Sequence, residues 1–208
     1  MTFNPEVPVD QGFIEVGNLG FLFPYVDILK GPNPFVLANP FETGGYTGEC
    51  YRWLQPELKG MASFLDVGCG TGWTIFQFRK LFPNVKFIGV DLSYLMLGCC
   101  YCTQYYLHDQ EPKFMMGDIE KGLPLVGNSF DVVWSSHTLE HAKNPTVALK
   151  EMFRIGKKVI GMFPNGLFAD SAHHLSPMNQ EEFMLAAQPL GLTVESQVFD
   201  KLIGFKVK

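Results

Sequence analysis

The sequence lacks the features that would place its 208 residues in a membrane, outside the cell or on nucleic acid. No run of about 18 apolar residues occurs, so we expect no membrane-spanning helix. The first residues do not combine a basic segment with an apolar one, so we expect no secretory signal. Positive charge is scarce, and the formal net charge of −5 argues against nucleic acid or an anionic membrane as the default partner.

Cysteine is too sparse and too unevenly spaced for a disulfide framework. The five cysteines are an odd number, and Cys99, Cys100 and Cys102 lie almost side by side. No second Cys/His pair stands near enough to complete a zinc site, so we expect these three to be small apolar residues on a buried helix. This cysteine usage, with no Asn-x-Ser/Thr site that has a permitted middle residue, predicts a reducing, cytoplasmic setting.

Residues 1–60 differ from the rest because proline, glycine and aromatic residues are concentrated there. Proline and glycine at this density prevent long helices, and so many aromatic side chains are not expected to face water together. We therefore predict an irregular N-terminal arm over residues 1–60, with a short helix near 47–58, that packs on the main domain and covers a binding site. Plain packing of the arm is the alternative.

Residues 61–208 alternate between short apolar runs and segments with helical spacing, which predicts an α/β domain on a doubly wound, mostly parallel sheet. The expected strands are 61–67, 85–90, 112–117, 130–136 and 157–163, and the expected helices are 72–82, 93–107, 144–156 and 179–188. The last two apolar runs, LTVESQVF and LIGFKVK, have no helix between them, so we expect an antiparallel hairpin.

Residues typical of helix ends mark these borders. Ser93 and Asn144 are expected to cap two N-termini, and Asn179 with Glu182 has the spacing of a capping box. Gly156 stands where a helix would end on a C-terminal glycine.

The segment after the first expected strand reads GCGTG over residues 68–72, two residues after Asp66. Glycines between a strand and a helix let a ligand approach the backbone. A dinucleotide-binding loop would need a small residue where Trp73 stands, and no Lys-Ser/Thr pair follows, as a phosphate-binding loop would require. The loop therefore predicts a different ligand from either.

Acidic residues end the next two expected strands. A carboxylate at Asp91 can accept two hydrogen bonds from a ribose diol. Asp118 suits an exocyclic amine, and Ile119 can pack on the face of a ring. This edge of the sheet therefore favours a nucleoside.

Four motifs, FLDVGCGTG, VDLS, GDIE and LPLVGNSFDVVWSSHTLEH, follow one another at successive strand ends. Together they resemble the motifs of the class I S-adenosylmethionine-dependent methyltransferases, over roughly residues 61–165. The resemblance implies a Rossmann-like sheet of seven strands with the last one reversed. It also implies S-adenosylmethionine as the cofactor, lying across the carboxyl ends of the strands.

The resemblance implies roles for individual residues. The methionine end of the cofactor is expected to lie against six residues: Asp66, Gly68, Cys69, Gly70, Ser135 and Ser136. The nucleoside end is expected to meet four: Asp91 at the ribose, and Leu92, Asp118 and Ile119 at the adenine. From the arm, Tyr46 and Arg52 are the candidates for closing over the cofactor.

Histidines cluster after the fourth expected strand, where the methyl group should point. Some methyltransferases of the resembled class carry Glu-x-x-Glu-His there and bind a divalent cation; here the string is His137-x-x-Glu140-His141, and His173 or His174 would be a fourth ligand. We expect no metal, and we take His137, His141 and His174 as catalytic candidates, with His137 accepting a proton or orienting the acceptor. A purely structural turn is the alternative.

These observations predict a methyltransferase that acts on a small organic acceptor, because the chain is not basic and shows no large inserted domain. Nucleic acid and membrane are not expected as partners. The alternatives are a protein or RNA-end methyltransferase, and a non-catalytic, methyltransferase-like binding subunit. The acceptor, the accepting atom and the oligomeric state stay open.

Overall fold

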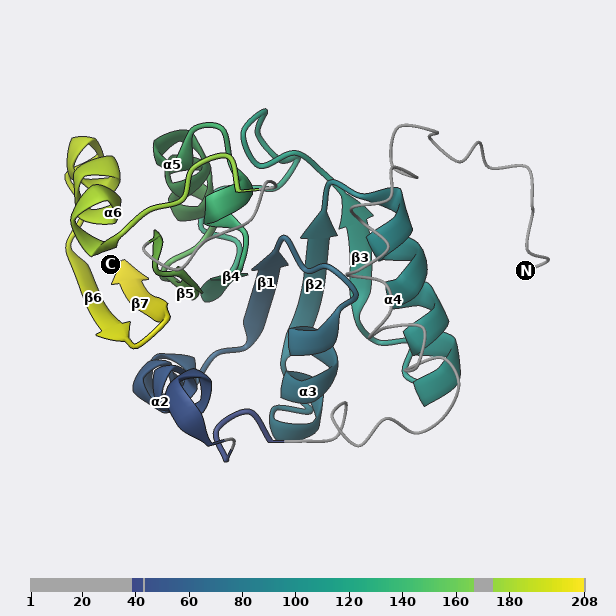
Figure 1. Cartoon of the computed structure of the whole chain (residues 1–208). Coiled ribbons are helices and arrows are strands. Elements are labelled where there is room, and N and C mark those ends of the chain that lie inside the picture. Colours follow the sequence, from purple (N-terminus) through teal and green to yellow (C-terminus); the bar gives the residue numbers. More distant parts are fainter. Residues whose placement is uncertain (1–38, 43, 167–173, 208) are drawn as a thin grey trace.

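The computed structural model describes residues 39–42, 44–166 and 174–207, which form one seven-stranded sheet in the order β3-β2-β1-β4-β5-β7-β6 (Figure 1). Its strands are β1 (Ser63–Val67), β2 (Lys86–Asp91), β3 (Lys113–Met116), β4 (Val132–Ser136), β5 (Val159–Pro164), β6 (Val194–Phe199) and β7 (Leu202–Val207). The helices are α2 (Gly45–Leu54), α3 (Trp73–Leu81), α4 (Tyr94–Leu107), α5 (Pro145–Ile155) and α6 (Gln180–Ala187). Short 3-10 helices are η3 (Gln55–Leu58), η4 (Leu139–His141) and η6 (Gln188–Leu190).

The strand pairing confirms the fold class predicted from the sequence. Strands β1 to β5 pair in parallel, whereas β7 is antiparallel to both β5 and β6. The chain runs outward from β1 through β2 to β3, and then returns to the other side of β1 for β4. Ligands of open α/β sheets bind at such a reversal of strand order, outside the carboxyl ends of the strands.

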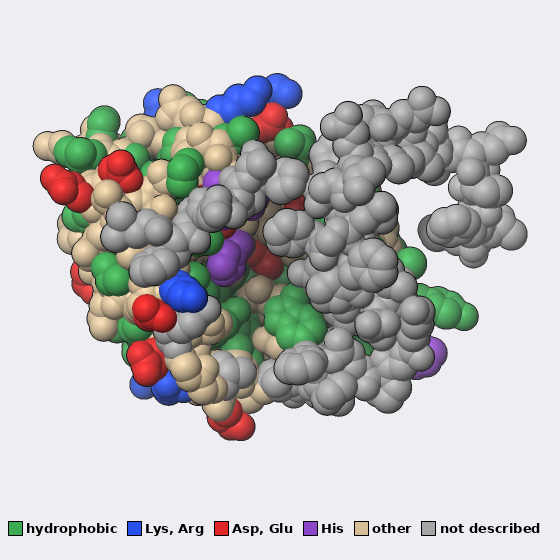
Figure 2. Space-filling view, viewed as in Figure 1, with side chains coloured by type: hydrophobic (Ala, Val, Ile, Leu, Met, Phe, Trp, Pro, Cys, Tyr) green, Lys and Arg blue, Asp and Glu red, His purple; other side chains and the backbone are tan. Residues whose placement is uncertain are grey.

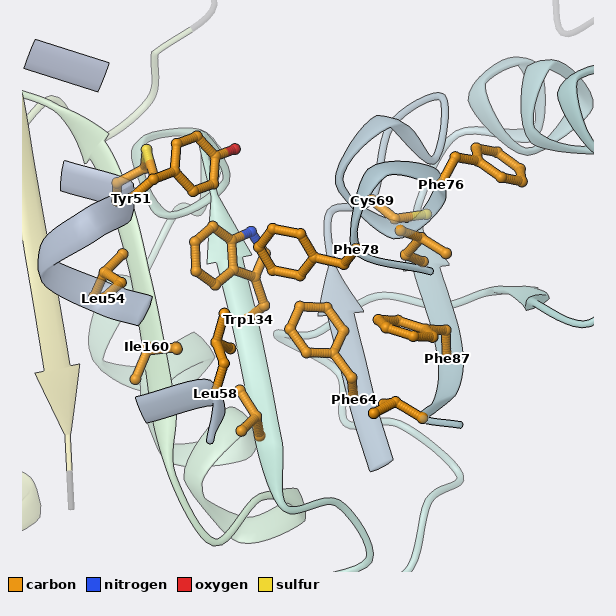
Figure 3. Packing of buried hydrophobic residues seen from close by; sticks show 14 of the residues in the cluster. Tyr51, Leu54, Leu58, Phe64, Cys69, Phe76, Phe78, Phe87, Trp134 and Ile160 are labelled. Atoms are coloured by element: carbon orange, nitrogen blue, oxygen red, sulfur yellow. The ribbon is translucent and has the colours of Figure 1, made fainter. Parts of the chain in front are cut away.

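Helices bury an apolar core on each face of the sheet. On one face, α2, α3 and α4 enclose an aromatic cluster in which Phe64, Phe78 and Trp134 are fully buried (Figure 3). On the other face, α5 and α6 pack their apolar sides against a cluster that includes Phe163 and Phe205. A sheet buried on both faces explains why its central strands are continuous apolar runs in the sequence.

The predicted helix caps are present, with one difference. The Ser93 hydroxyl accepts a hydrogen bond from the Met96 N–H, and the Asn144 side chain accepts one from the Val147 N–H. Asn179 and Glu182 form a reciprocal capping box.

Gly156 ends α5 as predicted, but not as a left-handed residue, since its φ is −107° and its ψ is 150°. Its extended backbone forms a bridge with Phe130, and a Cβ there would collide with Val133. Close packing against the sheet, rather than a positive φ, is therefore what requires glycine at this position.

The predicted arm is described only in part. Residues 1–38 lie outside the described residues, so their expected role as a cover stays a prediction. The helix expected near 47–58 is present as α2 followed by η3. This helix packs on the C-terminal hairpin, where Cys50 and Trp53 lie directly over Gly204. Among the described residues, none of the helices is both long and apolar enough to cross a membrane.

Candidate active site

The glycine loop joins β1 to α3 and turns through three left-handed glycines. The φ angles of Gly68, Gly70 and Gly72 are 71°, 54° and 78°, values that other residues adopt only with strain. A Cβ on Gly68 would overlap the Thr138 side chain, whereas one on Gly70 would have no atom within 4 Å. The loop is therefore tightly packed at Gly68 and has open space at Gly70, so a ligand can reach the backbone at Gly70.

The backbone N–H groups of this loop donate within the protein. Those of Gly68 and Cys69 both donate to the Val90 carbonyl, and that of Gly72 donates to the Cys69 carbonyl. A phosphate-binding loop instead turns its N–H groups toward the ligand. The hydrogen bonding thus agrees with the argument from Trp73 against a phosphate or dinucleotide ligand.

Asp91 ends β2 and fixes the glycine loop. One carboxylate oxygen accepts the Gly70 N–H at 2.8 Å, and the other accepts the Ser93 N–H at 2.8 Å. Burial raises the pKa of Asp91, and these backbone hydrogen bonds oppose that rise. Each oxygen keeps a second lone pair, so the carboxylate can also accept hydrogen bonds from a diol.

Asp66 is a buried carboxylate at the centre of the same edge, only 2% exposed. Burial raises its pKa well above the ordinary value, and the nearby charge of Asp91 raises it further. Among the described residues, no hydrogen-bond donor to this carboxylate is found. A buried, unpaired carboxylate is costly, so this position is suited to a cationic group of a ligand.

Tyr51 lies beside this carboxylate, and the sequence analysis did not select it. Its ring stacks on Trp134 with centroids 5.7 Å apart and an angle of 11° between the planes (Figure 3). Burial, and then the nearby charge of Asp66, raise the pKa of Tyr51, and the Thr74 side chain opposes that rise. The only sequence signal is its place next to Cys50 on the buried side of a short helix. Which strand that helix covers depends on tertiary packing.

Tyr46 and Arg52, the arm residues proposed from the sequence, also belong to α2. Arg52 is exposed, and its guanidinium donates to the Phe41 carbonyl at 3.2 Å. The Tyr46 side chain lies outside what the structure describes. A role for either residue in closing over the cofactor stays a prediction.

At the nucleoside end, Leu92 is exposed and Ile119 packs against the apolar cluster under α5. Asp118 accepts the Glu120 N–H at 3.0 Å and pairs with Lys121 at 3.1 Å. Burial would raise the pKa of Asp118, but the hydrogen bonds from Lys121 and the Glu120 N–H hold it below the ordinary value. The Asp118 carboxylate thus already has local partners, the Glu120 N–H and the Lys121 ammonium.

Of the other expected methionine-side residues, Ser135 and Ser136 end β4, and Cys69 lies in the glycine loop itself. Ser135 is 1% exposed, and its hydroxyl has no hydrogen-bond partner among the described residues. The Ser136 carbonyl accepts the Thr138 hydroxyl. Cys69 is buried against Cys100, whose thiol donates to the Gly70 carbonyl at 3.1 Å.

The histidine motif leaves β4 through a strained turn. His137 has a φ of 53°, its side chain is 52% exposed, and its Nδ1 lies 3.5 Å from a Glu140 carboxylate oxygen. Glu140, His141 and His174 each offer one ligand atom, and these atoms lie within 4.8 Å of one another. Figure 2 shows histidine and acidic side chains side by side near the middle of this face. His173 lies outside the described residues.

The residues present fit S-adenosylmethionine. The uncompensated Asp66 carboxylate suits an ammonium group, Asp91 suits a ribose diol, and the open space above Gly70 lets a ligand reach the backbone between them. All three lie at the carboxyl ends of β1 and β2, next to the reversal of strand order.

Comparisons with known proteins agree with this geometry. Residues 65–159 match the family described as a methyltransferase domain. An uncharacterized methyltransferase of Schizosaccharomyces pombe is 32% identical over 130 residues, which are 54% of this chain and 45% of the relative. A malonyl-[acyl-carrier protein] O-methyltransferase of Halalkalibacterium halodurans is 29% identical over 67% of this chain and 50% of its own length. The chain thus spans half, or less, of these curated relatives.

The fold has close structural counterparts. The crystal structure of an S-adenosylmethionine-dependent methyltransferase from Aquifex aeolicus superposes with a TM-score of 0.66 at 19% identity, covering 88% of this chain and 96% of that one. The sheet order, the strand-end acids, the glycine loop and the matched domain lead to one conclusion. Residues 65–159 form a methyltransferase domain, and the described chain has the fold of the class I S-adenosylmethionine-dependent methyltransferases.

Proposed function

We propose that this protein transfers the methyl group of S-adenosylmethionine to a small organic acceptor. The observation that carries the proposal is the meeting of Asp66, the Gly70 backbone and Asp91 at one edge of the sheet, where the Asp91 carboxylate holds the loop at 2.8 Å. The sulfonium of the cofactor supplies an already activated methyl group, so the protein has chiefly to hold the acceptor in line with it.

The chain's own residues divide this work. Asp91 would hold the ribose, Asp66 would compensate the ammonium, and the orphaned Ser135 hydroxyl would gain a partner at the methionine end. Tyr51, which is buried on Trp134 and near enough to Asp66 to feel its charge, would border the site from α2. Exclusion of water keeps the charge pairing between Asp66 and the ligand strong.

The acceptor side is assigned to His137. This residue directly follows β4, its N–H donates to the Met162 carbonyl at 2.9 Å, and its ring is half exposed. A fixed backbone with an accessible imidazole suits a group that takes the acceptor's proton or orients it. Among the curated relatives, several are named as methyltransferases of a malonyl group on a carrier protein, which supports a small acyl acceptor.

A transfer assay tests the proposal. The purified protein is incubated with S-adenosylmethionine carrying a labelled methyl group and with fractionated metabolite extract, and label in small-molecule products is measured. We expect a labelled organic product that Asp91→Ala abolishes. Label only in RNA, or only on protein side chains rather than on an acyl group borne by a carrier protein, would replace the small acceptor with a macromolecule. Tight cofactor binding without any transfer would indicate a non-catalytic subunit.

A further inference from the structure

Glu140 is a buried carboxylate in the turn after β4. It is 1% exposed, and neither carboxylate oxygen has a hydrogen-bond partner among the described residues. Nδ1 of His137 is 3.5 Å from one of these oxygens but does not meet it with hydrogen-bond geometry. Buried polar groups in folded proteins are nearly always paired, so an unpaired carboxylate calls for a missing partner.

Two imidazoles face the same space. The rings of His141 and His174 have centroids 5.1 Å apart at an angle of 70°, and Nδ1 of His174 is buried without a partner. The Ser176 N–H donates to the Glu140 carbonyl at 3.0 Å, which holds the segment carrying His174 against η4. Three side chains from two separate segments thus converge, and two of them carry orphaned atoms.

We infer that Glu140, His141 and His174 form a site for a divalent transition-metal ion of the zinc type. A metal–ligand bond of about 2.0–2.2 Å places two ligands of one tetrahedral ion about 3.4 Å apart, so atoms already within 4.8 Å need only side-chain rotations to converge. Two imidazoles and one carboxylate are a ligand set that zinc takes in sites with an open fourth position. Magnesium prefers oxygen ligands, so this set disfavours it.

This inference departs from the expectation of no metal, and it uses three of the residues that the sequence motif brought together, without His137. His137 is not part of the converging group, and its exposed ring is left for the acceptor. The site lies close to the cofactor edge, because His141 is near enough to Asp91 to lower the pKa of that carboxyl. If the proposed function is correct, an oxygen or nitrogen of the acceptor would complete the metal's coordination. Zinc binding itself does not depend on that function.

Zinc chloride titrated calorimetrically into chelator-treated full-length protein tests the inference. We expect one zinc ion per chain, little response to magnesium, and a higher thermal midpoint with zinc present. Glu140→Gln and His174→Ala should each weaken zinc binding by at least about tenfold, the loss that even supporting residues of metal sites cause. His108→Ala is the matched control, because His108 is an exposed histidine at the end of α4, and it should bind zinc like the unaltered chain.

The His174 variant and one cysteine variant keep the result decisive. If Glu140→Gln does not fold, the partly exposed His174 supplies the answer, because its loss removes no buried charge. Absence of zinc binding in the unaltered protein would overturn the inference. The inference would also be overturned if Glu140→Gln and His174→Ala both kept zinc binding while Cys102→Ser, which removes an exposed thiol, abolished it. S-adenosylhomocysteine binding, measured in the same preparations, reports separately on the proposed function.

Discussion

The Asp91 carboxylate accepts the N–H of Gly70 at 2.8 Å across the gap between β2 and the loop after β1. One side chain therefore both shapes the glycine loop and presents lone pairs to a ligand at the edge of the sheet. With the proposed ribose contact at Asp91, loop geometry and ligand binding are coupled through this hydrogen bond, so a substitution at Asp91 is expected to change both.

Asp91→Ala should weaken binding and also lower the stability of the free protein. Hydrogen bonds to a charged group contribute roughly 1.5–3 kcal/mol each, so affinity for S-adenosylhomocysteine should fall by at least about tenfold. The thermal midpoint without ligand should fall too, because the Gly70 and Ser93 N–H groups lose their acceptor. Calorimetry and thermal unfolding measure the two effects. Asp109→Ala, which removes an acid paired with Arg79, is the control and should leave affinity unchanged.

Asp66→Asn should stabilise the free protein while weakening cofactor binding. Because burial raises the pKa of Asp66, the charged form opposes folding at neutral pH, and the neutral amide removes that cost. As pH falls through the raised pKa, the unaltered protein should gain stability relative to the variant. Urea unfolding from pH 7 to pH 4 measures this. If Asp66→Asn were less stable than the unaltered protein at pH 7, Asp66 would not be a buried carboxylate without a compensating partner.

Asp131→Asn should show the opposite dependence on pH. The Asp131 carboxylate accepts hydrogen bonds from the Ala62 and Ser63 N–H groups and forms an ion pair with Lys157 at 2.8 Å. The contacts with Lys157 and with the Ala62 N–H are the main reasons why the pKa of Asp131 is lowered to about 2. A lowered pKa means stabilisation that is complete above the unfolded pKa of about 3.9 and is lost as pH falls toward the folded value. The difference in unfolding free energy between protein and variant should therefore be constant from pH 7 to pH 5 and shrink by pH 3. A difference that grows below pH 5 would be inconsistent with this.

Gly68→Ala should destabilise the loop strongly. The new methyl group would overlap the Thr138 side chain, and the left-handed backbone alone costs other residues roughly 1–2 kcal/mol. Gly98→Ala is the control, because Gly98 lies within α4 and a Cβ there would have open space around it. The free energy of unfolding of this variant should rise by about 0.5–1 kcal/mol. Chemical unfolding of both variants gives the comparison, and equal effects would rule out the packing argument.

The sequence predicted the fold, and it also predicted that the glycine loop and the strand-end acids lie at one edge of the sheet, because both depend on local patterns. Apolar runs, capping residues and the GCGTG spacing are read directly from neighbouring residues, and the order of strands follows from their alternation with helices. Gly156 was predicted as a helix terminator, but its extended conformation is set by Val133 and Phe130 from the sheet.

Contacts between distant segments were not predictable in the same way. Tyr51 reaches Asp66 only because α2 packs over β4, and His174 reaches Glu140 only because Ser176 ties its segment to η4. Sequence spacing could suggest that the histidines belong to a functional site, but it could not show that His141 and His174 are the ones that lie beside Glu140. The roles assigned to Tyr46, Arg52 and the histidines stay predictions.

Binding of S-adenosylhomocysteine to the isolated protein tests the central claim most directly. The account predicts saturable one-to-one binding by calorimetry, weakened at least about tenfold by Asp91→Ala, and no binding of NAD under the same conditions. Binding of NAD together with no response to S-adenosylhomocysteine would contradict the assignment of the glycine loop, Asp66 and Asp91 to this cofactor.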